Sequence, residues 1–269
     1  MNKRYLIIGL GLLVIILGVA LSRGPARKTN PVDSGALPAQ QSYELAVSLE
    51  GKNELLNAKE LYQKIISESP DFKDIGTVQK KLEDLNMRII FSGLETPQTL
   101  MHEVVSGDSL GKIANKYNTT VALIKKSNKL SSDTIRVGQR LRIWQGVFNI
   151  FVDKSQNILI LKSGDEILKV YTVSTGSDNI TPVGTFTVVN KLVDPVWYKS
   201  GAIIPPESPK NILGTRWLGF DIPGYGIHGT TEPQSLGQQV TAGCIRMSNE
   251  EVEELYDLAP KGTKVTIVD

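Results

Sequence analysis

Cysteine and histidine are scarce in this chain, and their scarcity excludes several kinds of site. The 269 residues include one cysteine and two histidines. A single cysteine excludes an intramolecular disulfide, and three such residues provide no ligand cluster of the kind that holds a metal ion. We therefore expect no metal site and no cofactor.

Charge of one sign is also lacking. The 30 lysines and arginines nearly balance 28 aspartates and glutamates, leaving a net charge of +2, and aromatic residues make up only 6% of the chain. Nucleic-acid-binding proteins usually carry a basic patch or stripe. Because both signs are mixed along this sequence, we expect no nucleic-acid partner.

The N-terminus holds a long uncharged apolar run. Residues 5–21 are built from Leu, Ile, Val, Gly, Ala and Tyr and follow Lys3 and Arg4. Their length is at the short limit for a membrane span. We expect residues 1–21 to be a transmembrane signal anchor, with a signal peptide cleaved near Ala20 as the alternative. Residues 22–41, rich in proline, glycine and small polar residues, are expected to form a flexible linker.

Residues 42–92 have the spacing of amphipathic helices. Apolar side chains recur every three or four positions up to Ile66, stop at Ser69-Pro70-Asp71 and resume at Val78. This pattern predicts an α-helical hairpin and resembles part of a tetratricopeptide repeat. A single such unit lacks the stacked neighbours that repeats use to bury their faces. Two roles stay open: a spacer, or a surface that binds a protein partner.

Residues 101–144 read as a unit of strand, helix, helix and strand. Gly107-Asp108-Ser109 and Thr120 provide caps for the two helices, and Asn128 precedes the closing strand. The pattern resembles a LysM domain along its full length. The resemblance implies a small βααβ module that binds glycans containing N-acetylglucosamine, with Gly107, Asp108, Ser109 and Asn128 as candidate glycan-binding residues. His102 is expected to pack or to be solvated at the strand edge.

Residues 146–269 form the largest domain. Short apolar runs separated by Gly, Asp and Pro turns predict strands beginning at Phe148, Ile158, Ile167 and Gly184, with a last strand over residues 264–268. One helix is predicted over residues 249–258. We therefore expect a mostly β sandwich-like domain with one C-terminal helix.

Cys244 and His228 are the candidate reactive residues of this domain. A thiol reacts as the thiolate, and a histidine held by a third group can accept its proton. Gly226, Gly229 and Gly243 lie beside them, where a glycine lets the backbone approach a substrate. A lone cysteine is also common as a small buried apolar residue. The residues by themselves leave catalysis and simple burial open.

Three elements of this domain resemble the signature of the L,D-transpeptidase (YkuD-type) catalytic domain. They are Thr181-Pro182-Val183-Gly184-Thr185-Phe186, Ile227-His228-Gly229-Thr230 and Thr241-Ala242-Gly243-Cys244-Ile245-Arg246-Met247. The resemblance implies a cysteine acyltransferase that acts on peptidoglycan stem peptides. It gives Cys244 as nucleophile, His228 as general base, Gly229 as the residue whose carbonyl orients the imidazole, Arg246 as a basic site residue, and the amides of Gly243 and Cys244 as oxyanion donors. Tyr225, Trp217 and Thr241 are candidate substrate contacts, although Trp217 could equally belong to the core.

Ala242 departs from the family pattern, because many members have a second histidine there. The site would then depend on His228 alone. The expected reaction forms 3→3 cross-links, or joins stems to another amine, through a Cys244 thioester. An L,D-carboxypeptidase, with water as acceptor, and a non-catalytic wall-binding scaffold are the alternatives. We expect the protein at the bacterial cell membrane, with its C-terminal domains outside the cytoplasm and glycan strands and stem peptides as partners.

Overall fold

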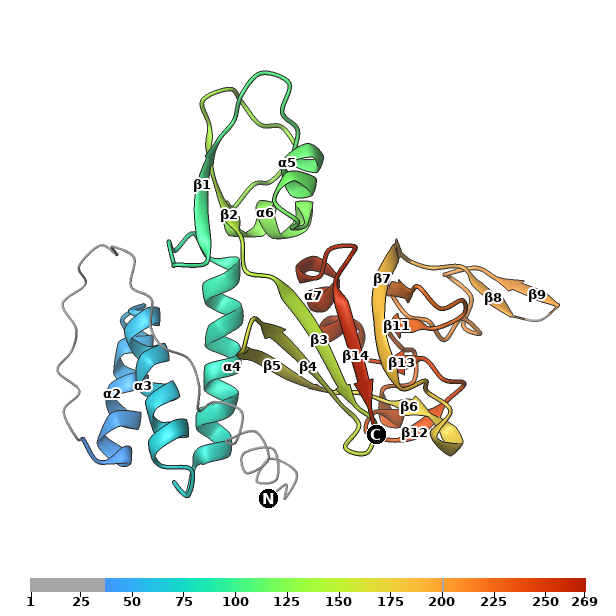
Figure 1. Ribbon diagram of the computed structural model, residues 1–269, viewed down its shortest axis with the longest axis horizontal. Coiled ribbons are helices and arrows are strands. Elements are labelled where there is room, and N and C mark those ends of the chain that lie inside the picture. Colours follow the sequence, from blue (N-terminus) through green and yellow to red (C-terminus); the bar gives the residue numbers. More distant parts are fainter. Residues whose placement is uncertain (1–36, 200) are drawn as a thin grey trace. The chain divides into compact units, whose positions relative to one another are not determined.

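The computed structural model describes residues 37–199 and 201–269. The chain divides into two compact units, residues 1–97 and residues 98–269 (Figure 1). The anchor expected over residues 1–21 and most of the linker expected over residues 22–41 lie outside the described residues. Within the described ranges, every helix is too short or too polar to cross a membrane.

The first unit is helical. It contains α2 (Ala39–Gly51), α3 (Leu55–Glu68) and α4 (Ile75–Phe91). The predicted hairpin is thus three helices, because Asn53 has a φ of 61° and separates α2 from α3. The first helix also begins at Ala39, inside the expected linker. The three helices share a core of buried residues, comprising Ala46, Leu49, Leu55, Ala58, Leu61, Tyr62, Ile65, Val78, Leu85 and Ile89.

The second unit begins with the predicted βααβ module, which is confirmed. Strands β1 (Thr99–Glu103) and β2 (Arg140–Trp144) pair antiparallel, and α5 (Leu110–Lys116) and α6 (Val121–Ser127) lie between them in the chain. Both helices begin at the expected caps: the hydroxyls of Ser109 and Thr120 accept hydrogen bonds from the amides of Lys112 and Leu123. Such caps satisfy amide groups that have no partner inside the helix.

The rest of the second unit is mostly β with one C-terminal helix, as predicted. Its elements are β3 (Phe148–Asp153), β4 (Ile158–Ser163), β5 (Glu166–Thr172), β6 (Thr175–Gly176), η1 (Ser177–Asn179), β7 (Gly184–Val193), β8 (Trp197–Lys199), β9 (Ala202–Ile204), β10 (Arg216–Phe220), β11 (Gly226–His228), η2 (Pro233–Ser235), β12 (Gln239–Thr241), β13 (Ile245–Arg246), α7 (Asn249–Leu258) and β14 (Lys264–Val268). Eight strands form one curled sheet in the order β13-β11-β10-β7-β14-β3-β4-β5. The pairs β6–β12 and β8–β9 stand apart as two small sheets.

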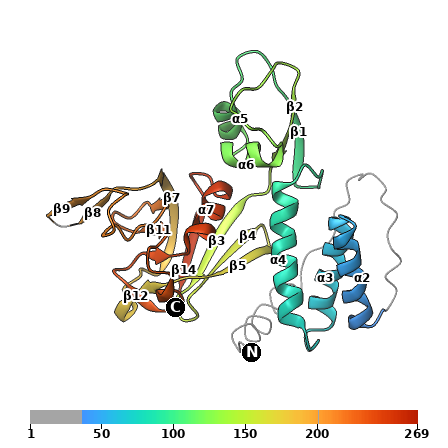
Figure 2. The ribbon, with the colours of Figure 1, turned by 180° about the vertical axis from the view of Figure 1, so that it is seen from behind.

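Buried and partly exposed side chains alternate along the strands, and the buried ones form the core of this domain. Phe148, Ile150 and Val152 of β3 are buried while the residues between them are partly exposed, because successive side chains point to opposite faces of a sheet. Helix α7 lies over the sheet in both views (Figure 1, Figure 2). It contributes Val252, Leu255 and Leu258 to the core. The consecutive neighbours β10, β11 and β13 form one end of the sheet, where the candidate active site lies.

Candidate active site

His228 ends strand β11 and is buried, with 3% of its surface exposed. Its ring stacks on Trp217 of the neighbouring strand, with centroids 6.0 Å apart and planes 17° apart. The ring nitrogen Nδ1 lies 2.6 Å from the carbonyl oxygen of Gly229, the group expected to orient it. A carbonyl can only accept, so Nδ1 carries the hydrogen and Nε2 is left with a lone pair. This tautomer can receive a proton at Nε2.

Electrostatics keep the His228 imidazole neutral at pH 7. Burial lowers the pKa of His228 to about 4; the hydrogen bond to Gly229 opposes this change, and the nearby positive charge of Arg246 adds to it. A charged imidazolium would lose its hydration in this position. The residue is therefore present as the free base over the neutral pH range.

Cys244 lies in the turn between β12 and β13. Strands β11 and β13 pair in parallel, with His228 opposite Arg246. Cys244 precedes Arg246 by two residues, and the charge of Arg246 acts on the pKa of both Cys244 and His228. The Cys244 thiol donates to the carbonyl of Gly224, with 3.4 Å between sulfur and oxygen. The fold thus gathers residues 16 positions apart at one sheet end.

Burial raises the pKa of the Cys244 thiol above its ordinary value. A backbone hydrogen bond from Gly226 and the charge of Arg246 act in the opposite direction and are smaller effects. With a low pKa on His228 and a raised one on Cys244, the resting pair is a neutral thiol and a neutral imidazole. Proton transfer must therefore accompany attack on a substrate.

The turn that carries Cys244 depends on Gly243. Its φ is +113°, and a Cβ there would come within 2.7 Å of the Tyr225 ring, so only glycine fits. Tyr225 thus lies directly against the turn. The hydroxyl of Thr241 accepts from the Gly243 amide at 3.2 Å and donates to the Cys244 carbonyl at 2.6 Å.

These contacts bear on two of the predicted roles. The Gly243 amide, predicted as an oxyanion donor, already donates to the Thr241 hydroxyl. Thr241, predicted as a substrate contact, is 5% exposed, and its hydroxyl bonds within the turn. Short polar side chains often hydrogen-bond their own backbone in this way.

Arg246 is buried at 5% exposure and is held by the loop before β12. One of its terminal nitrogens lies 2.9 Å from a Glu232 carboxylate oxygen and 2.8 Å from the Ser235 hydroxyl. Its Nε is buried and lacks a hydrogen-bond partner in the described part of the chain. The guanidinium therefore keeps a positive charge close to both Cys244 and His228.

Trp217 packs against the imidazole of His228. Its indole nitrogen donates to Asn190 at 3.0 Å, and its ring covers the imidazole. The same Asn190 oxygen accepts from the amide of Gly219. The tryptophan is thereby held by both its indole nitrogen and its ring face, and its role as a substrate contact stays a prediction.

Asn249, the first residue of α7, also holds the loops beside His228. Its side-chain oxygen accepts from the amides of Thr230 at 3.0 Å and Thr215 at 3.3 Å. A Cβ at Gly229 would lie 2.2 Å from that oxygen, which explains the glycine after His228. No spacing in the sequence relates residue 249 to residue 229; only the fold does.

The predicted glycan-binding residues of the βααβ module divide into two groups. The Asn128 side-chain amide donates to the carbonyls of Ile124 and Arg142 and accepts from the Arg142 amide, so it holds β2 in place. Asp108 accepts from His102 and from the Val105 amide, and the pKa of its carboxyl is lowered, first by the Val105 bond and then by His102. Gly107 and Ser109 are exposed beside it.

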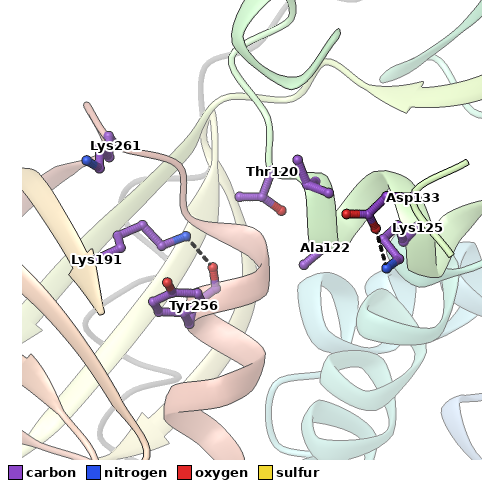
Figure 3. A pocket seen from close by; sticks show the side chains of 8 residues that line it. Thr120, Ala122, Lys125, Asp133, Lys191, Tyr256 and Lys261 are labelled. Carbon is purple, nitrogen blue, oxygen red and sulfur yellow. Dashed lines mark hydrogen bonds and ion pairs between the residues drawn. The ribbon is translucent and has the colours of Figure 1, made fainter. Parts of the chain in front are cut away.

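A hollow of about 500 Å³ lies between α6 and α7 (Figure 3). Lys191, Lys125 and Asp133, three charged residues of its lining, have partners. Lys191 donates to the carbonyls of Tyr256 and Ala259, and burial lowers the pKa of this lysine to about 8. Lys125 lies 2.6 Å from Asp133. None of the predicted catalytic residues lines this hollow, and its contacts serve the packing of α6 against α7. Elsewhere, no group of three or more His, Cys, Asp or Glu side chains in the described ranges could hold a metal ion.

Comparisons with known proteins identify two domains in the chain. Residues 148–267 match the L,D-transpeptidase catalytic domain (YkuD), and residues 102–144 match the LysM domain. YqjB of Bacillus subtilis (strain 168), assigned to the L,D-transpeptidases, is 43% identical over 126 residues, which are 45% of this chain and 70% of YqjB. YkuD of the same organism, assigned likewise, is 30% identical over 175 residues, covering 62% of this chain and 98% of YkuD.

A solved L,D-transpeptidase from Mycobacterium tuberculosis H37Rv is 20% identical, with a TM-score of 0.41 over 49% of this chain and 63% of that chain. This chain therefore spans less than two thirds of that solved chain. The relatives from Bacillus settle the class: the C-terminal domain is a cysteine transpeptidase domain. The chain belongs to the L,D-transpeptidase family of peptidoglycan cross-linking enzymes, and it carries a LysM domain that binds peptidoglycan. It acts on the cell wall, outside the cytoplasm.

Proposed function

We propose that Cys244 is the nucleophile and His228 the general base of this L,D-transpeptidase. One observation supports the proposal: β13, which directly follows Cys244, pairs with the strand that ends at His228, and the Gly229 carbonyl favours the tautomer that can accept a proton. The sequence contains one cysteine, so a cysteine transpeptidase has no other thiol to use. Arg246 favours the thiolate electrostatically as it forms.

The reaction proceeds in two halves. As Cys244 Sγ attacks the carbonyl carbon of the third residue of a tetrapeptide stem, its proton passes to His228 Nε2. The tetrahedral oxyanion is stabilised by the amide of Cys244. The C–N bond then breaks, the terminal D-alanine leaves with the proton from His228, and a thioester remains on Cys244.

The second half transfers the acyl group. The side-chain amine of a neighbouring stem attacks the thioester carbonyl and loses a proton to His228, and the thiol is regenerated. The product is a 3→3 cross-link. Attack by water at the same carbonyl would release a tripeptide, which is the L,D-carboxypeptidase reaction.

The remaining segments would bring this site to its substrate. Residues 101–144 would hold glycan strands, and residues 1–21 and 22–41 would serve as membrane anchor and linker. Residues 42–92 would act as a spacer or bind a protein partner. Binding a wall polymer through a second module raises the local concentration of stem peptides around the catalytic domain of residues 146–269.

Incubation of the full chain with purified tetrapeptide muropeptides tests the proposal. We expect wild type to give cross-linked dimer or tripeptide, and Cys244→Ala and His228→Gln to give neither. His102→Gln, which alters the only other histidine, is the matched control and should retain activity on soluble muropeptides. Product formation by Cys244→Ala at the wild-type rate would refute the assignment. A wild-type protein that binds peptidoglycan without turnover would favour the scaffold alternative.

A further inference from the structure

Thr181 is a buried hydroxyl that joins two loops beside Cys244. It is 2% exposed, accepts from the Gly176 amide at 2.7 Å and donates to the Gly243 carbonyl at 2.9 Å. A Cβ at Gly176 would lie 3.0 Å from Gly243 Cα, so the two backbones are in direct contact. The Thr181 hydroxyl is therefore positioned by the Gly176 amide and in turn holds the Cys244 turn through the Gly243 carbonyl.

The hydrogen bond from Thr181 to the Gly243 carbonyl determines the direction of the Cys244 amide. The Gly243–Cys244 peptide is trans, and in a planar trans peptide the carbonyl and the following N–H point in opposite directions. Because the Gly243 oxygen points inward to Thr181, the Cys244 N–H must point the other way. That direction leads out of the interior, to the side on which Cys244 is partly exposed.

Without this hydrogen bond, little would hold that peptide plane. Gly243 is free of the steric limits that a Cβ imposes, so rotation of the plane about it meets a small barrier. The Thr241 hydroxyl bonds to the Gly243 amide and to the Cys244 carbonyl, which belong to the peptides before and after this one, whereas Thr181 bonds to the carbonyl of this peptide itself. The orientation of the Cys244 amide thus rests on Thr181.

Thr181 is itself anchored by a buried lysine. Lys154, 2% exposed, donates to the Thr181 carbonyl at 2.9 Å and to the Asn179 carbonyl at 3.3 Å. The Asp269 carboxylate lies 2.9 Å from the same ammonium and accepts from the Asn179 side chain. A paired and hydrogen-bonded buried charge is costly to disturb, so this loop holds the hydroxyl in a fixed position.

We propose that Thr181 is a positioning residue that aims the Cys244 amide as the oxyanion donor. This inference rests on the proposed function, since it requires Cys244 to be the nucleophile. It explains why the site keeps a donor although the Gly243 amide is engaged by Thr241. If the hydroxyl only stabilised the fold, its removal would lower substrate binding, thiol reactivity and turnover together.

The test compares turnover with a thiol reaction that needs no oxyanion donor. Thr181→Val and Thr181→Ser are assayed with a tetrapeptide donor for kcat and KM, and with iodoacetamide for the alkylation rate of Cys244. Removing an oxyanion donor typically lowers kcat by about 10²–10³. A donor that is present but misaligned should lower kcat by less than a donor that is absent. We therefore expect Thr181→Val to lower kcat about 10- to 100-fold with little change in KM.

Alkylation of Thr181→Val should stay within about twofold of wild type, and Thr181→Ser should retain most of the turnover. Ser177→Ala is the matched control, because this nearby hydroxyl only approaches the Thr241 carbonyl at 3.5 Å. Thr181→Ala takes the place of the valine variant should that variant fail to fold. Unfolding of both, undiminished kcat, or an equal loss of alkylation and turnover would each overturn the inference. An inactive wild type would instead count against the proposed function.

Discussion

Replacing His228 by glutamine should remove a measurable part of the acid sensitivity of this protein. Burial lowers the pKa of His228 to about 4, whereas an imidazole in an unfolded chain has a pKa of about 6.5. Between these values the unfolded chain binds more protons than the folded one. The free energy of unfolding therefore falls as the pH falls through this window, and the stabilising contribution is complete above about pH 6.5.

The magnitude follows from the two pKa values. Taking the pH from 7 to 4.5 protonates the imidazole almost fully in the unfolded chain but only partly in the folded one. The linkage relation then gives a loss of about 2 kcal/mol for wild type. Carboxyl groups with lowered pKa values, such as Asp221 and Asp269, also reduce the free energy of unfolding as the pH falls. Their contribution is equal in wild type and in His228→Gln. The difference between wild type and His228→Gln isolates the histidine.

Urea unfolding followed by tryptophan fluorescence provides the assay. Trp144, Trp197 and Trp217 all lie in the unit of residues 98–269, so their emission reports on that unit. We expect wild type to lose about 2 kcal/mol more than His228→Gln between pH 7 and pH 4.5. Equal losses in the two proteins would refute the conclusion that His228 is buried and neutral, and with it the argument for an unprotonated base.

Three further predictions test other parts of the site. Gly243→Ala should abolish turnover, because a Cβ would meet the Tyr225 ring at 2.7 Å; Gly262→Ala, with the same sign of φ and open space, should lose stability only. Ser248→Ala removes the cap of α7 and should lower the free energy of unfolding by about 1 kcal/mol in urea; an unchanged midpoint would contradict this role. The alkylation rate of Cys244 should rise with pH through a pKa above that of a free thiol, about 8.5, since burial raises it; a plateau already reached near pH 6 would indicate a preformed ion pair.

Local sequence signals predicted the elements of this protein well. The last helix and the last strand occupy the expected residues 249–258 and 264–268, because a Ser cap, a run of acidic residues and a following proline mark them in the sequence. The break between α2 and α3 was missed. It depends on the left-handed conformation of Asn53. Asparagine tolerates this conformation, but its presence in a sequence does not predict it.

The candidate site was predictable only as a set of residues. The sequence identified Cys244 and His228, and the resemblance supplied the Gly229 carbonyl, which the structure places 2.6 Å from the imidazole. The contacts that decide which groups are free could not be predicted. Thr181 and Asn249 act through hydrogen bonds to segments that are distant in the sequence, and neither composition nor spacing encodes such pairings.

Mass spectrometry of the acyl-enzyme tests the central claim most directly. The full chain is mixed with a tetrapeptide donor in the absence of an amine acceptor, quenched in acid and digested. The account predicts a thioester adduct, the mass of the donor less D-alanine, on the peptide that contains Cys244, and none in Cys244→Ala. An adduct on another peptide, or product formed by wild type and Cys244→Ala alike, would contradict it.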